Sequence, residues 1–74
     1  MIKIGDLITV PWDPDHLRLV QKVELEWTTN LKNQNKWIIF CYHPQTKIIS
    51  KFFMYEVVYE DRTIYTPSVT IVAA

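Results

Sequence analysis

The segment at residues 17–27 constrains the fold most, because polar and apolar side chains alternate along it. Five apolar side chains fall on one face of an extended strand: Leu17, Leu19, Val23, Leu25 and Trp27. Four charged side chains fall on the other face: Arg18, Lys22, Glu24 and Glu26. Val20 and Gln21 break the pattern. A period of two is typical of a strand that packs one face on a core and leaves the other in water, so the segment predicts an antiparallel sheet.

The rest of the chain also favours strands. Alanine occurs only at positions 73 and 74, while β-branched and aromatic residues dominate. Further strands are expected at residues 2–10, 36–43, 48–60, 63–65 and 69–72, with loops at 11–16 and 28–35 and a hairpin turn at 43–47. Gly5 and Asp6 interrupt the first of these strands, so its pairing is expected to begin at Asp6. Segment 36–43 is apolar on both faces, as a central strand is. Apolar positions change phase within 48–60, which predicts a bulge or sharp bend that transfers the chain between two sheets.

Length and strand number together predict the architecture. A chain of 74 residues is expected to form one domain, residues 1–74. Five to six short strands in such a chain predict a small antiparallel β-barrel. Closing the sheet would also remove exposed edges, along which a chain this apolar would otherwise pair with other copies. The asparagines of 28–35 are expected to make the turns that glycine usually makes, because Gly5 is the only glycine.

Residues 4–10 (IGDLITV) resemble the first strand of many SH3-like barrels, which often begin with a Gly-Asp pair followed by alternating aliphatic residues. The resemblance implies an all-β, five- to six-stranded SH3-like barrel. It would place the long first loop of that fold at residues 11–16 and the closing strand within 63–72. SH3-like barrels bind peptides, RNA, DNA or other subunits, so the resemblance assigns no functional residue.

Charge and cysteine content narrow the class of protein. Eight basic residues balance eight acidic ones, so there is no general attraction to nucleic acid or to an anionic membrane. Cys41 is the only cysteine, which excludes an intramolecular disulfide and a zinc site built from several cysteines. No signal-peptide core follows Met1, and no apolar run is long enough to span a bilayer. We expect an intracellular, cytoplasmic protein with no membrane partner.

Two constellations could carry chemistry, and each has a simpler interpretation. Asp13, Asp15 and His16 could hold a divalent ion, but turn chemistry explains two aspartates beside a proline. Cys41 could form a nucleophile and base with His16 or with His43, which would share its strand face, but a cysteine in an apolar run behaves as a small hydrophobe. The sequence therefore predicts a protein that is not an enzyme, with no metal site, no cofactor and no evident small-molecule substrate.

Surplus apolar and aromatic residues favour an interaction module. Its partner-binding residues are expected among the aromatic groups near loops and strand ends: Trp12, Tyr42, His43, Phe53 and Tyr55. The preferred hypothesis is a non-enzymatic module that binds a protein partner or itself, such as an accessory protein of a phage or other mobile element. The alternative is a nucleic-acid-binding barrel, in which the same aromatic groups stack on bases and lysines contact phosphates: Lys36, Lys47 and Lys51.

Overall fold

The computed structural model describes residues 1–29 and 33–73 of the chain. All regular secondary structure in this part is β, as predicted, and it consists of six strands: β1 (Leu7–Val10), β2 (Asp13–Thr29), β3 (Gln34–His43), β4 (Ile48–Val58), β5 (Thr63–Thr66) and β6 (Thr70–Ala73). Strands occupy both ends of the expected loop at 28–35, of which residues 30–32 lie outside the described part. Within the described residues, no helix is long and apolar enough to cross a membrane.

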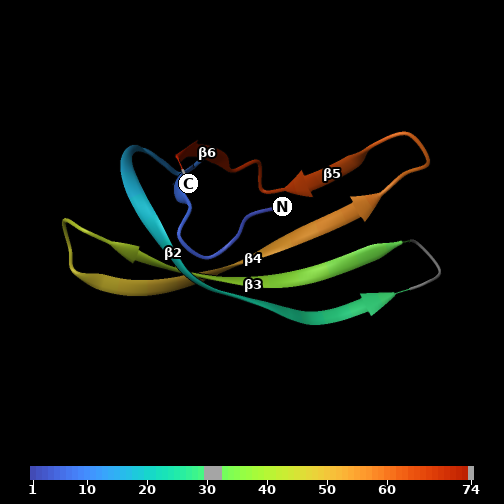
Figure 1. Ribbon diagram of the computed structural model, residues 1–74, viewed down its shortest axis with the longest axis horizontal. Helices are drawn as coiled ribbons and strands as arrows, with labels where there is room; N and C mark the ends of the chain where they lie inside the picture. Colours follow the sequence, from blue (N-terminus) through green and yellow to red (C-terminus); the bar gives the residue numbers. More distant parts are fainter. Residues whose placement is uncertain (30–32, 74) are drawn as a thin grey trace.

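The six strands form one antiparallel sheet in the order β5-β4-β3-β2-β1-β6. The sheet curls so that β6 at one edge lies across from β3 and β4, while β5 at the other edge pairs with β4 (Figure 1). The last strand pairs with the first, while β5 and β6 form the two edges of the described sheet. The architecture is therefore a half-barrel, which confirms the all-β antiparallel prediction.

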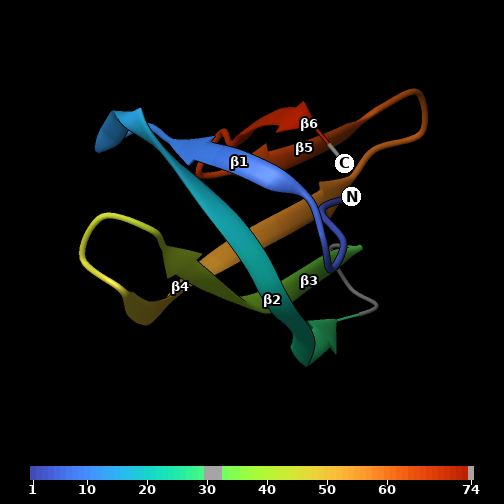
Figure 2. The same ribbon diagram turned by 60° about the vertical axis from the view of Figure 1, so that its left-hand side comes forward.

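Strand β2 carries the chain from one part of the sheet to the other. It is 17 residues long and runs diagonally between β1 and β3 (Figure 2). Val20 pairs with Cys41 and Lys22 pairs with Phe40, so the register shifts at Gln21. This β-bulge explains why Val20 and Gln21 break the alternation of the sequence. It also corrects the single apolar face predicted for 17–27, because Leu19 lies opposite Tyr42 whereas Val23 lies opposite Ile39, on the other face of the sheet.

The bulge and the transfer between two sheets predicted within residues 48–60 are not found in β4, which stays in one sheet. Its register with β3 runs without a shift from Gln34↔Val57 to His43↔Ile48. The change of apolar phase has another cause. Ile48 and Ile49 follow directly on the turn at the tip of the hairpin and are both exposed. Phe52 and Phe53 lie on opposite faces, and both faces are apolar.

The core fills the inner side of the curl. Its buried hydrophobic residues are Ile2, Ile8, Val10, Val20, Ile39, Cys41 and Met54. Ile2 reaches the core although it precedes β1. The pairing expected from Asp6 is close to the observed one, because Val20 N–H donates to the Asp6 carbonyl at 2.9 Å and β1 begins at Leu7; residues 2–5 are not a strand. Gly5, with φ +96°, turns the chain there and donates a hydrogen bond to the Val20 carbonyl at 3.0 Å. Residues 1–6 therefore pack on the sheet as a folded segment rather than as a strand.

Two further turns use the left-handed backbone region. Asn33 has φ +48°, as expected for an asparagine that replaces glycine in the 28–35 segment. Lys47 has φ +59° at the end of the β3–β4 turn, where its N–H donates to the His43 carbonyl at 2.8 Å. A lysine in this region is unfavourable, and the sequence gives no indication of it.

Candidate interaction surface

The β3–β4 hairpin presents a second apolar face, turned away from the core. Directly opposed residues of an antiparallel pair point to the same side of the sheet. Besides the terminal pair Gln34 and Val57, the register gathers eight side chains on this side: Lys36, Ile38, Phe40, Tyr42, Ile49, Lys51, Phe53 and Tyr55. We call this set the outer face. Phe53 is 43% exposed and Ile49 is 60% exposed, whereas Ile38, Phe40, Tyr42 and Tyr55 are half-buried against their neighbours in the sheet.

Lysine charges on the outer face lie over aromatic rings. The Nζ of Lys36 is 4.2 Å from the centroid of the Phe53 ring and 3.1 Å from Oε2 of Glu26. The hydrogen bond to Glu26 raises the pKa of Lys36 despite partial desolvation. Lys22 of β2 lies over the Phe40 ring and pairs with Glu24. Carboxylates therefore balance the charges of Lys36 and Lys22, whereas Lys51 on the same face is exposed.

The structure gathers most of the residues predicted to bind a partner, but not all of them. Tyr42, Phe53 and Tyr55 lie on the outer face together with Lys36 and Lys51. Trp12 is 56% exposed, as expected, but it packs edge-on against the inward-facing Phe52 at 5.4 Å between centroids. Lys47 lies in the hairpin turn, and His43 is buried on the core side. The single aromatic surface expected from the sequence is therefore divided.

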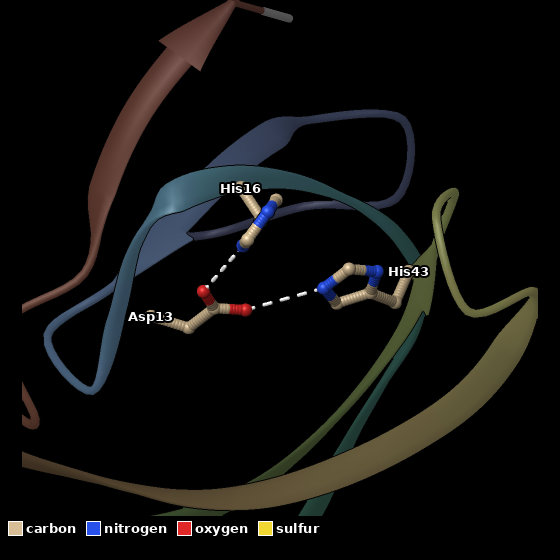
Figure 3. Close-up of side chains that lie close together, drawn as sticks. All are labelled: Asp13, His16 and His43. Atoms are coloured by element: carbon tan, nitrogen blue, oxygen red, sulfur yellow. Dashed lines mark hydrogen bonds and ion pairs between the residues drawn. The ribbon is translucent and has the colours of Figure 1, made fainter.

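His43 belongs to a polar cluster at one end of the core side (Figure 3). Residues 11–16 were expected to be a loop, but β2 begins at Asp13, and only Pro11 and Trp12 turn the chain. The Asp13 carboxylate accepts hydrogen bonds from His16 Nδ1 at 2.7 Å, from His43 Nε2 at 3.2 Å and from Arg18 Nη2 at 3.0 Å. These bonds, above all the one from His16, lower the pKa of Asp13 to about 2 although partial burial acts against them.

Arg18 and Ser50 complete this cluster, and neither residue was predicted from the sequence to belong to a site. Arg18 Nη1 donates to Ser50 Oγ at 3.3 Å, while its Nε is buried and has no hydrogen-bond partner among the described residues. Cys41 and His43 share the core side, as expected, but His43 is bonded to Asp13 and Cys41 Sγ lies 3.9 Å from Ser50 Oγ. An open depression adjoins the cluster, lined by Asp13, Arg18, His43, Thr46, Ile48 and Ser50.

A second polar group lies towards the other end of the core side. Burial pushes the pKa of Glu56 upward, but hydrogen bonds from Asn35, Tyr65 and Trp37 outweigh it, and the net shift is downward. Asn35 donates to Glu56 Oε1 at 2.6 Å and Trp37 Nε1 donates to the same oxygen at 3.3 Å. This carboxylate therefore has a structural role, because it satisfies the polar atoms of its neighbours.

No family model, curated protein or solved structure matches the chain.

Proposed function

We propose that this protein is a non-enzymatic interaction module that binds a protein surface through the outer face of β3 and β4. The observation that supports this proposal is the composition of that face. It combines aromatic and aliphatic side chains with Lys36, whose charge Glu26 balances, and with the exposed Lys51. Continuous apolar surface on a small protein is typical of a site that another molecule covers. Tyrosine and other aromatic residues are also the groups that contribute most to protein–protein binding.

A second copy of the chain is the first partner to test. The outer face is part of an extended sheet, and the same patch on two copies could meet about a twofold axis. Molar mass by light scattering, measured over a hundredfold range of protein concentration, should then rise from monomer to dimer. A mass that stays monomeric throughout would contradict self-association and would direct the search to another protein.

Two matched variants locate the surface. Ile49 on the outer face is 60% exposed, and Ile4 in the N-terminal segment is 66% exposed. Ile49→Lys should abolish the concentration-dependent rise in mass, because it places an unpaired charge in the interface. Ile4→Lys changes the same residue type at a similar exposure outside the outer face, and it should leave association unchanged. Equal effects of the two variants would contradict this placement of the interface.

The alternative is binding of single-stranded nucleic acid. One observation favours it: Lys36 and Lys51 lie on the same face as Phe53 and Tyr55. Bases could stack on the aromatic rings while lysines contact phosphates. Affinity for a mixed-sequence oligonucleotide should then fall steeply with salt, and Lys51→Ala should reduce the slope. Absence of binding at low salt would contradict this alternative.

We further propose that the half-barrel is a variant of the SH3-like fold. Gly5-Asp6 precedes β1, and the last strand closes onto the first. One departure is that the expected long first loop is replaced by a two-residue turn and the start of β2. An experimental structure in which β5 and β6 lie in a topology unrelated to SH3-like barrels would contradict this assignment.

A further inference from the structure

The Asp13–His16–His43 cluster depends on an irregularity in the backbone. Ile8 pairs with Arg18 and Val10 pairs with Asp13, so Thr9 alone stands opposite residues 14–17. In a regular strand, side chains three positions apart point to opposite faces. The bulge cancels this alternation and brings the His16 ring back to the Asp13 carboxylate. Bulges of this kind re-aim side chains and are frequent beside functional sites.

The third member of the cluster comes from β3, at the turn of the β3–β4 hairpin. His43 is the last residue of β3, thirty positions from Asp13, and its ring lies 5.3 Å from that of His16 between centroids. Figure 3 shows both imidazoles directed at the two oxygens of one carboxylate. The three potential ligand atoms lie within 4.8 Å of one another. Two distant segments thus supply two nitrogen donors and one oxygen donor to the same point.

We propose that Asp13, His16 and His43 form a binding site for a divalent transition-metal ion, with Zn²⁺ as the expected ion. Two imidazoles and one carboxylate are a donor set that zinc accepts, with three protein ligands and a fourth position for water. An anion does not fit, because the carboxylate at the centre would repel it. The open depression beside His43 would give the fourth position access to solvent. The site lies on the core side and is separate from the outer face.

Metal binding requires only small rearrangements. Metal–ligand bonds of about 2.0–2.2 Å place tetrahedral ligands about 3.4 Å apart. The His16–Asp13 pair at 2.7 Å must therefore open, and no pair needs to close by more than about 1.4 Å, because all three atoms lie within 4.8 Å of one another. Each ligand nitrogen must offer its lone pair to the metal, so the proton on His16 Nδ1 must move to Nε2 and that on His43 Nε2 must move to Nδ1. The His43 shift removes the hydrogen bond from Thr46 N–H to Nδ1, which at 3.4 Å is already long.

Arg18 has two effects on the proposed site. Its Nη2 donates to Asp13 Oδ2 and thereby orients the carboxylate, as outer-shell partners of metal ligands commonly do. Its positive charge also opposes a dication, so zinc should bind more weakly than in closed structural sites. No metal site was expected from the sequence, in which Asp13, Asp15 and His16 had no further ligand nearby. In the folded chain, His43 supplies that ligand.

The direct test is calorimetric titration of the untagged full chain with ZnCl₂, together with thermal unfolding and light scattering. We expect one zinc per chain, no change in molar mass, and a melting temperature about 10 °C or more higher at a zinc concentration about 100 times Kd. No binding heat and no shift of the melting temperature would overturn the proposal. Zinc-induced doubling of the mass would overturn it as well, because the ligands would then come from two copies.

Variants assign the ligands. His16 is partly exposed, so His16→Gln should fold normally and should lower the zinc affinity by more than the roughly 10–100-fold typical for loss of an outer-shell partner. His43→Gln should do the same, with folding checked by circular dichroism. Asp15→Asn and Cys41→Ala remove the nearby alternative ligands and should leave the affinity unchanged. Unchanged affinity in His16→Gln, or its loss in Cys41→Ala, would overturn the assignment.

Discussion

Substitution of Ile39 tests whether the centre of the core has been located correctly. Ile39 lies in the middle of the central strand, is 0% exposed, and stands between Val23 and Phe52. Ile39→Ala removes three carbon atoms, each worth about 0.8 kcal/mol of transfer free energy, and leaves a cavity. The expected loss is therefore about 3–4 kcal/mol, within the range of about 2–5 kcal/mol seen for such substitutions. Ile39→Val should cost only about 0.5–1.5 kcal/mol.

The neighbouring Ile38 provides a matched control. It is the same residue type on the same strand, but it lies on the outer face and is half-buried. In the monomer, Ile38→Ala should cost less than half as much as Ile39→Ala, since fewer apolar contacts are lost. Urea unfolding of all three variants at low protein concentration measures these differences. A loss below about 1 kcal/mol for Ile39→Ala, or equal losses for the two alanine variants, would refute the reasoning.

Three further predictions follow from the backbone and from the polar cluster. Lys47→Gly should stabilise the protein by about 0.5–1 kcal/mol in urea unfolding, because glycine relieves the left-handed strain, whereas Lys47→Ala should not. Gly5→Ala should cost about 1–3 kcal/mol from strain alone, since a Cβ at position 5 would meet no atom within 4 Å; a neutral substitution would contradict this. The pKa of Asp13 is lowered from 3.8 to about 2, so its contribution to stability is complete above pH 4 and is lost as the pH falls towards 2. Unfolding midpoints over this range should drop less for Asp13→Asn than for the wild type, and Asp15→Asn should behave like the wild type.

The sequence predicted those features of the fold that local patterns determine. Alternation within 17–27, the two-sided apolar strand at 36–43 and the turn at 43–47 correctly indicated an antiparallel all-β structure. The position of the β-bulge in β2 could not be predicted in the same way. Val20 and Gln21 marked a break in the alternation, but a break records only that the phase changes. Whether it becomes a bulge depends on the pairing of β2 with β3, which is a property of the folded sheet.

Of the candidate sites, the outer face could be predicted in part from local patterns, whereas the polar cluster around Asp13 could not. Tyr42, Phe53 and Tyr55 could be grouped once β3 and β4 were recognised as a hairpin, because a hairpin turn determines which residues are opposed. The partnership of Asp13 with His43 could not be predicted, since the register of β2 with β3 begins at Leu19 and Tyr42 and both residues lie beyond it. The spacing of Asp13 and His16 even argues against their contact in a regular strand. Only the bulge opposite Thr9 makes that contact possible.

The length of β2 has a consequence for how the protein opens. One uninterrupted strand pairs with β1 on one side and with β3 on the other, so neither part of the sheet can detach while β2 keeps its hydrogen bonds to both. Amide protons in the middle of β2 should therefore exchange with solvent only when the whole molecule unfolds. Those of β5 and β6, which are four-residue strands at the edges, can exchange through local fraying. The curled sheet would thus behave as one cooperative unit with two loosely held margins.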